Sequence, residues 1–299
     1  MVCNNAPEDK STLDLSLIAQ ENLTVIANGK LSGKSALGNH KIRYDWKQKQ
    51  PVPAYTFGFA IGRYNEFTEQ ASETSLKYCA ENYTSEELEQ IFKETPKMLR
   101  YFEKRSGVAY PETSYTQILA EGSSSQEMAG LSIIRNNYGK QVLNNPTEIN
   151  LSAHEMAHQW WGNRVTCKNW KHFWLNEGFA VFMSSAYKEH RFGKEAYLKD
   201  IEVYYNAYQE VMKKGLDKAL VFDDWSNPSP EDRTLVYYKG AYVLHLLRQE
   251  LGEDEFWGGI RRYTQTNFGK SVKTSDLQKA MEKSTGRSLE HFFSTWIYK

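Results

Sequence analysis

Residues 154–158 read His-Glu-Met-Ala-His, and residues 174–180, on the next predicted helix, read Trp-Leu-Asn-Glu-Gly-Phe-Ala. The imidazoles of His154 and His158 are four residues apart, so they stand on one face of a helix, one turn above the other. A carboxylate from the second helix, Glu177, then completes a three-ligand zinc site. Three protein ligands leave the fourth tetrahedral position for water, which is typical of catalytic zinc rather than structural zinc.

Glu155 is expected beside this metal rather than on it, because the helical period of 3.6 residues turns it about 100° away from His154. A carboxylate in that place is suited to act as a general base on water. The pattern therefore predicts a zinc hydrolase. The alternative interpretation is a pair of buried histidines that are hydrogen-bonded in a core, with Glu155 at the surface.

A helix over residues 148–161 is predicted from the signals that flank the histidines. Asn145 is a plausible N-cap, Pro146 lies just inside the helix, and Glu148 places an acidic side chain in its first turn. Gly162 offers a C-terminal stop one turn after the second histidine.

Residues 154–166 and 174–180 resemble the core of the M1 zinc aminopeptidases, the gluzincins. In that family eighteen residues separate the second histidine from the glutamate ligand, as they do between His158 and Glu177. The resemblance extends over most of the chain. It implies that the two histidines and Glu177 hold one zinc ion and that Glu155 is the base.

Composition narrows the class of protein. The chain has 37 Lys and Arg against 37 Asp and Glu, a balance that favours neither nucleic acid nor an anionic membrane as a partner. The sequence contains no run of about eighteen apolar residues and no charged start followed by an apolar stretch, so we expect neither a membrane span nor a signal peptide. The compartment stays undetermined. Cys3, Cys79 and Cys167 are an odd number of cysteines without a regular spacing, which argues against a disulfide framework. Cys167 is expected to be a small buried residue.

Residues 1–66 alternate apolar and polar side chains and are predicted to be all β. Residues 13–17 form one such run, and Asn28-Gly29 predicts a hairpin between two others. The opening segment, residues 3–15, resembles the middle of the family's N-terminal β domain. The resemblance implies a piece of a longer protein, without the first strands of that domain and without a C-terminal helical domain.

Residues 67–299 are predicted to be a mainly helical catalytic domain that resembles the thermolysin-like fold. A short β region around residues 117–120 precedes the helices. The chain is therefore predicted to be α+β, with a partial all-β N-terminal domain followed by a thermolysin-like zinc peptidase domain. Helices are predicted, with Gly193 and Gly252 as stops, over residues 85–105, 148–161, 175–191, 195–213, 231–251, 254–267 and 274–284.

Residues 237–240 read Tyr-Tyr-Lys-Gly and carry a candidate donor for the reaction. Peptide hydrolysis develops negative charge on the carbonyl oxygen, and a fixed phenol stabilises that charge. Tyr237 shares its helix face with apolar side chains, whereas Tyr238 belongs to a polar row. The family pattern, a tyrosine two places before Lys-Gly, also selects Tyr237. The alternative is that this tyrosine only packs in the core or at the surface. Lys239 and Arg233 are expected on a solvated helix face.

Residues 124–131 read Ser-Ser-Gln-Glu-Met-Ala-Gly-Leu. In the family the corresponding strand reads Gly-x-Met-Glu-Asn, often followed by Ala-Gly-Leu; its backbone pairs with the substrate and its glutamate holds the substrate's free amino group. Alignment on Ala-Gly-Leu places Glu127 on that glutamate, with Gln126, Met128 and Ala129 beside it as substrate-binding residues. A carboxylate near the zinc is what a free α-ammonium needs. The flanking residues depart from the motif, so the alternative is that Glu127 is an ordinary exposed carboxylate.

The resemblance implies a zinc-dependent aminopeptidase that hydrolyses the N-terminal bond of peptides. Glu155 is expected to take the water proton and to deliver it to the leaving amine. Two alternatives stay open, namely an endopeptidase or epoxide hydrolase that uses the same site, and a zinc-bound peptide-binding module or weakly active fragment. The expected partners are peptides with a free N-terminus and further domains of a longer parent chain.

Overall fold

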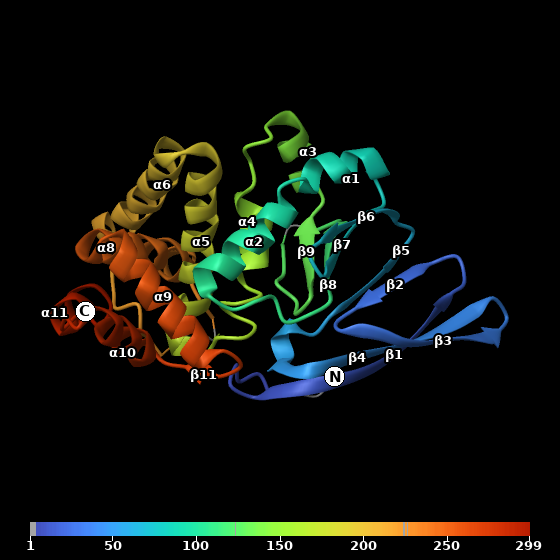
Figure 1. The fold of residues 1–299 in the computed structure, drawn as a ribbon, viewed down its shortest axis with the longest axis horizontal. Coiled ribbons are helices and arrows are strands. Elements are labelled where there is room, and N and C mark those ends of the chain that lie inside the picture. Colours follow the sequence, from blue (N-terminus) through green and yellow to red (C-terminus); the bar gives the residue numbers. More distant parts are fainter. Residues whose placement is uncertain (1–3, 123, 224, 226) are drawn as a thin grey trace. The chain divides into compact units, whose positions relative to one another are not determined.

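The computed structural model describes residues 4–122, 124–223, 225 and 227–299. These residues form two compact units (Figure 1). The first unit comprises the residues up to Asn5 together with 9–99 and 110–159, and the second comprises 6–8, 100–109 and 160–299.

The N-terminal part of the first unit is built of strands, as predicted. Its longest strands form an antiparallel sheet of order β1-β4-β3, and a separate antiparallel pair joins β2 to β5. A short 3-10 turn, η1 (Ala54–Thr56), precedes β5. The bounds of these strands are β1 Lys10–Gln20, β2 Thr24–Ala27, β3 Lys30–Gly38, β4 Lys41–Pro53 and β5 Phe59–Gly62.

The hairpin predicted at Asn28-Gly29 is wrong. These residues connect β2 to β3, but the two strands pair with different partners. The tight turn of this region is at Asn39 and His40, whose φ angles of 50° and 55° are the left-handed conformation that a two-residue hairpin turn requires. Asn-Gly is a strong local turn signal, but it cannot specify which strands pair.

A four-stranded sheet of order β6-β7-β8-β9 completes the first unit. The β6-β7 pair is antiparallel, whereas β7, β8 and β9 are parallel. Helices cross over between β7 and β8, whereas the described residues between β8 and β9 form a loop without a helix. The bounds are β6 Asn65–Ala71, β7 Thr74–Ala80, β8 Ser114–Ala120, β9 Leu131–Arg135, α1 Ser85–Phe92, α2 Thr95–Ser106, α3 Asn137–Asn144 and α4 Asn150–Ala157.

Aromatic rings join this sheet to its helices. The ring of Tyr78 on β7 stacks on Phe92 at the end of α1, with centroids 4.8 Å apart, and Phe92 contacts Tyr138 on α3 at 6.4 Å. All three side chains are buried. The single helix predicted over 85–105 is two helices, α1 and α2, which a turn at residues 93–94 separates.

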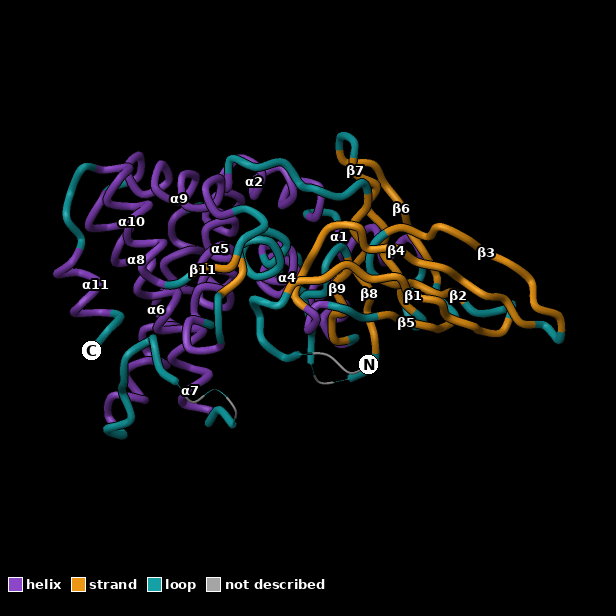
Figure 2. The backbone as a smooth tube through the Cα atoms, turned by 90° about the horizontal axis from the view of Figure 1, so that it is seen from below, coloured by secondary structure: helices purple, strands orange, loops and turns teal. Residues whose placement is uncertain are grey.

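The second unit is almost entirely helical, as the purple segments of Figure 2 show. Gly193 and Gly252 separate successive helices, as predicted, with φ angles of 88° and 79°. A two-residue parallel ladder joins β10 to β11, and a 3-10 turn, η2 (Trp170–His172), precedes α5. The other bounds are β10 Thr166–Cys167, α5 Trp174–Phe192, α6 Lys194–Lys213, α7 Pro230–Thr234, η3 Leu235–Lys239, α8 Gly240–Leu251, α9 Glu253–Asn267, β11 Ser271–Val272, α10 Thr274–Thr285 and α11 Glu290–Trp296.

The fold class is α+β, as predicted, and the helices predicted between residues 175 and 284 are present within a few residues. Helices α3 and α11 were not among the predicted elements, and the domain boundary at residue 66 stays a prediction. Cys79 and Cys167 are buried, whereas Cys3 lies outside the described residues. No helix in the described part of the chain is both long and apolar enough to cross a membrane.

Candidate active site

The helix that carries the two histidines, α4, is shorter than predicted at both ends. It begins after Ile149, and the predicted N-cap Asn145 instead ends α3. The Asn145 side-chain oxygen accepts hydrogen bonds from the backbone and the hydroxyl of Thr147, at 3.2 and 2.8 Å, in the local turn that asparagine commonly forms. Asparagine suits both a turn and a helix start, and here the turn prevails.

Helix α4 ends before Gly162, close to two tryptophans whose indoles make hydrogen bonds outside the helix. Trp160 and Trp161 are fully buried, and each donates its ring N–H to a different segment. The Trp160 indole donates to the carbonyl of Val108 at 2.9 Å, and the Trp161 indole donates to the Thr264 hydroxyl at 3.0 Å. Regular helix therefore stops at Ala157, with His158 as its C-cap.

The structure brings the predicted ligand side chains together. The Nε2 atoms of His154 and His158 lie 3.0 Å apart, with their rings perpendicular. Ligand atoms of both histidines and of Glu177 all lie within 4.8 Å of one another. His158 and Glu177 are buried, and His154 is half-buried.

This donor set fits a zinc ion. Tetrahedral zinc with Zn–N bonds of about 2.0–2.1 Å places two ligand nitrogens roughly 3.3 Å apart, close to the separation of the two Nε2 atoms. Two imidazoles and one carboxylate are also the donors of catalytic zinc sites that retain an open position. We therefore take these three residues as the ones that would hold the ion.

The first turn of α5 fixes the place of Glu177. The Trp174 indole donates to the Thr274 hydroxyl at 3.0 Å, and the side chain of Asn176 accepts from the backbone of Cys167 at 2.9 Å. His172 also hydrogen-bonds to Thr274, at 3.0 Å. Burial, together with nearby lysines, lowers the pKa of His172 to about 4, so this histidine is neutral at pH 7 and its hydrogen bond to Thr274 is structural.

Glu155 projects from α4 into the interior, with only 4% of its surface exposed. It lies near Tyr115 of β8, whose pKa is raised mainly by burial, is lowered by the hydrogen bond to Ser132, and is raised further by Glu155. The interpretation that placed Glu155 at the surface is therefore wrong. A buried carboxylate next to the histidines is where a general base is needed.

Tyr237 lies in a π-helical segment, η3, between α7 and α8. Such wide turns are rare and often mark functional sites. Tyr237 is half-buried, whereas 36% of Tyr238 is exposed and its ring stacks on Tyr204 with centroids 5.2 Å apart. The predicted difference between the two tyrosines is therefore present.

Lys239 is not on a solvated face, contrary to prediction. Only 2% of its surface is exposed, and its ammonium donates to the carboxylate of Asp217 and to the carbonyl of Lys218, both at 2.8 Å. The ion pair with Asp217, a residue far from Lys239 along the chain, holds the side chain in the interior, and helical periodicity does not indicate such a partner. Arg233, six residues earlier, is exposed as predicted.

Glu127 is buried, with 6% of its surface exposed, so the interpretation as an ordinary exposed carboxylate is wrong. Its neighbour Gln126 exchanges backbone hydrogen bonds with Ile133 of β9 at 2.8 and 3.1 Å. The Gln126 amide also donates to the Glu127 carboxylate at 2.6 Å. The segment therefore pairs with the edge strand β9 through Gln126, and its role in substrate binding stays a prediction.

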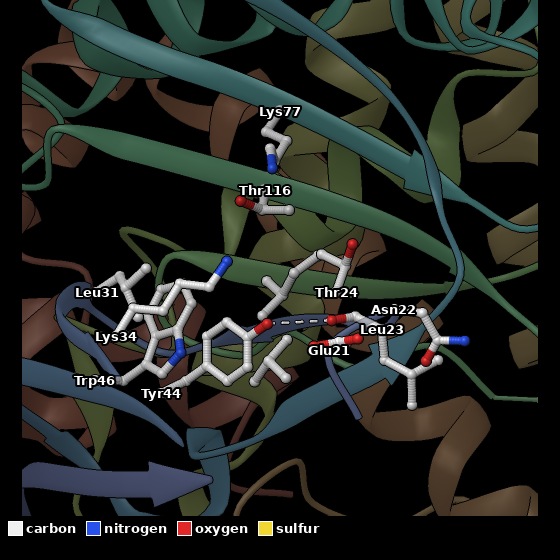
Figure 3. A pocket seen from close by; sticks show the side chains of 12 residues that line it. Glu21, Asn22, Leu23, Thr24, Leu31, Lys34, Tyr44, Trp46, Lys77 and Thr116 are labelled. Atoms are coloured by element: carbon white, nitrogen blue, oxygen red, sulfur yellow. Dashed lines mark hydrogen bonds between the residues drawn. The ribbon is translucent and has the colours of Figure 1, made fainter. Parts of the chain in front are cut away.

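A separate cavity of about 410 Å³ lies within the first unit (Figure 3). The rings of Tyr44 and Trp46 form part of its wall, and the Tyr44 hydroxyl donates to the carbonyl of Leu23 at 3.2 Å. The ammonium groups of Lys34 and Lys77 also line it, and Lys77 pairs with a glutamate at 2.6 Å. None of the candidate site residues lines this cavity.

The chain is similar to known aminopeptidases over almost its whole length. It is 27% identical to "Aminopeptidase A" of Gloydius brevicauda over 98% of this chain and 32% of that protein. It is 25% identical to "Probable aminopeptidase 2" of Sulfurisphaera tokodaii over 99% of this chain and 39% of that protein. It is also 25% identical to "Glutamyl aminopeptidase" of Bos taurus, over 98% and 32% of the two chains. The chain therefore spans about a third of the length of these relatives.

Solved structures share the fold. An M1 zinc metallopeptidase from Deinococcus radiodurans matches with a TM-score of 0.78 at 22% identity, over 100% of this chain and 66% of that one. A two-domain M1 zinc metallopeptidase mutant bound to L-tryptophan matches with a TM-score of 0.80, also at 22% identity and with the same coverage.

The Peptidase family M1 domain matches residues 90–296, which include both histidines, Glu155, Glu177 and Tyr237. With this match over more than half of its length, the chain belongs to peptidase family M1.

Proposed function

We propose that this chain carries the active site of a zinc-dependent aminopeptidase, with His154, His158 and Glu177 as the ligands of one zinc ion. The observation that carries the proposal is the convergence of these three side chains within 4.8 Å, with the buried carboxylate of Glu155 on the same helix as the histidines. The aminopeptidase names of the relatives support the reaction class.

A zinc ion in this site, when bound, supplies Lewis acidity that makes water a stronger acid and a better nucleophile near neutral pH. Glu155 accepts the proton of the attacking water and then delivers it to the nitrogen of the leaving amine. Burial suits this role because the carboxylate exchanges its proton with the reactants rather than with bulk solvent. The same residue thus serves as base and then as acid.

Tyr237 donates its phenolic proton in a hydrogen bond to the carbonyl oxygen as negative charge develops there. A phenol fixed on a helical element adds this stabilisation without reorganising during the reaction. The contribution is to the transition state, so it affects turnover more than substrate affinity.

Glu127 accepts hydrogen bonds from the α-ammonium of the substrate, in a charge-assisted contact that selects peptides with a free N-terminus. Gln126, Met128 and Ala129 form the rest of the substrate-binding segment. The burial of Glu127 on a segment that pairs with β9 through Gln126 supports this role. This feature favours an aminopeptidase over an endopeptidase or an epoxide hydrolase at the same site.

The test combines metal analysis with paired substrates. We expect one zinc per chain, hydrolysis of a peptide amide with a free N-terminus, and at least a hundredfold slower hydrolysis of its N-acetylated twin. Equal rates on both would remove Glu127 from its proposed role. Glu155→Gln should retain zinc and lose about 10²–10⁴-fold in kcat, and a variant that turns over normally would refute the assignment of the base.

A further inference from the structure

The side chain of Asn28 is a buried connector rather than part of a hairpin turn. Only 1% of its surface is exposed. Its amide nitrogen donates to the carbonyls of Thr56 at 2.9 Å and Ala129 at 2.7 Å, and its oxygen accepts from the backbone of Gly58 at 2.5 Å. A residue early in the chain thus holds the segment that contains Glu127.

Gln159 contacts the same segment. Its side chain is 3% exposed, donates to the carbonyl of Met128 at 3.1 Å and accepts from the backbone of Gly130 at 2.9 Å. Gln159 directly follows the proposed ligand His158, so the amide that contacts the segment belongs to the turn at the end of α4. This places the segment in a defined position relative to α4.

A third contact keeps the segment in register with Asn28. The backbone of Ala129 donates to the carbonyl of Thr56 at 3.2 Å. The Met128 side chain lies directly over Gly58, where an added Cβ would come within 2.1 Å of the Met128 sulfur. The segment therefore lies against residues 56–58 without room for a side chain between them.

We propose that Asn28 and Gln159 are positioning residues that set the distance between Glu127 and the histidines, and so determine the preference for substrates with a free N-terminus. Neither touches the reacting atoms in this scheme. The inference rests on the proposed aminopeptidase function. Its physical basis is that two buried amides bond to three consecutive residues, Met128 to Gly130, and leave the segment little freedom to slide.

Small changes in the distance between Glu127 and the histidines matter for catalysis. An ammonium and a carboxylate interact strongly only at hydrogen-bond distance, and a misplacement of about 1 Å can cost on the order of 10²-fold in rate. Loosening the segment should therefore weaken the binding of free-amine substrates. An N-acetylated peptide has no ammonium to bind, so its slower hydrolysis should not change.

The experiment uses the full chain with Gln159→Met, which keeps the approximate volume but removes both hydrogen bonds, and with Asn28→Ala. We expect zinc content equal to that of the unmodified protein and a 10- to 100-fold loss in kcat/KM for the free-amine peptide, mainly through KM. The rate on the acetylated twin should stay the same, so the ratio between the two substrates falls. A purely structural role would lower the melting temperature without changing that ratio.

Gln48→Met is the matched control. Gln48 is 2% exposed, and its side-chain amide donates to the backbone carbonyl of Gln50 at 3.1 Å and to the carboxylate of Glu112 at 3.2 Å. Neither partner belongs to the segment that contains Glu127. This variant should retain the substrate ratio. The double variant Asn28→Ala, Gln159→Met should lose less than the product of the two single losses, because both residues act on the same segment.

The outcomes separate this inference from the proposed function. If the unmodified protein hydrolyses both peptides equally, the amine-binding role of Glu127 fails, and the positioning role fails with it. If it discriminates, and zinc-loaded Gln159→Met discriminates equally well, only the positioning inference is overturned. Should Asn28→Ala not fold, the result with Gln159→Met still decides the question.

Discussion

Gly178 on α5 and Gly240 at the start of α8 bring two helix backbones into direct contact. A Cβ added to Gly178 would lie 3.0 Å from the Cα of Gly240 and 3.1 Å from the carbonyl oxygen of Val236. Gly178 directly follows the ligand Glu177, and Gly240 lies three residues after Tyr237. The contact therefore fixes the elements that carry the carboxylate ligand and the proposed oxyanion donor.

Gly178→Ala should disturb both elements. The new methyl group meets backbone atoms, which cannot move aside as a flexible side chain can, so we expect a loss of about 1–3 kcal/mol in the free energy of unfolding. Activity should fall further than stability because Glu177 and Tyr237 shift. Thermal unfolding and kcat measure the two effects. The control is Gly258→Ala, where the added Cβ meets only the Ser284 hydroxyl at 3.2 Å; there we expect unchanged activity.

Tyr237→Phe should lower kcat by about 10²–10³-fold with little change in KM, because it removes a donor that acts on the transition state. Steady-state kinetics on a free-amine peptide measures this. Tyr238→Phe is the control, since its ring stacks on Tyr204 and phenylalanine retains that stacking. If the loss follows Tyr238 instead, the assignment of the donor is wrong.

Removal of zinc should destabilise the protein. A ligand that binds only the folded state stabilises it by about 4 kcal/mol at a free concentration 1,000 times its dissociation constant, which corresponds to roughly 10 °C in melting temperature for a chain of this size. We expect a chelator to lower the melting temperature by about this amount and zinc to restore it. Glu155→Gln should show the same zinc-dependent shift. His158→Ala should show none, and a full shift there would contradict its role as a ligand.

His245 should make the protein less stable in acid. Burial first, and Arg248 second, lower the pKa of His245 to about 4, and the Tyr197 hydroxyl lies 2.7 Å from its Nδ1. His245 therefore takes up a proton near pH 6.5 in the unfolded chain but only near pH 4 in the folded chain. Its contribution to the free energy of unfolding is fully present above pH 6.5 and is lost as the pH falls from 6.5 to 4. We expect a loss of roughly 2–3 kcal/mol from this group.

Urea unfolding at several pH values between 7 and 4 measures this slope. His245→Gln removes the titrating group, so its stability should depend less steeply on pH over the same interval. An unchanged slope in that variant would assign the acid sensitivity to other groups, of which His172, with its pKa also near 4, is the first to examine.

The proposed metal ligands could be identified from the sequence by the four-residue spacing of the histidines and by the resemblance to the M1 family, which selects Glu177. Two histidines four residues apart share a helix face in any α-helix, and the start of α5 brings Glu177 to them. The difference between Tyr237 and Tyr238 also follows from local helical phase. These inferences hold because they depend on contacts within a turn or on a fixed separation along the chain.

Inferences that depended on distant partners did not hold. The end of α4 is set by the bonds of Trp160 and Trp161 to residues far away in sequence. Lys239 is buried because Asp217 lies beside it, which no periodicity within its own helix could indicate. The local sequence around Asn28, an asparagine before a glycine, is typical of a turn. Its three side-chain hydrogen bonds are to residues as distant as Ala129, and nothing in the local sequence indicates such partners.

The ladder between β10 and β11 bears on how the chain folds during translation. It pairs Thr166 with Ser271 and Cys167 with Val272, and Thr274 follows directly with its bond to Trp174 at the start of α5. A ribosome must release the chain past residue 274 before these contacts can form. The proposed carboxylate ligand on α5 should therefore reach its final place only after residue 274 has left the exit tunnel, more than a hundred residues behind the two histidines.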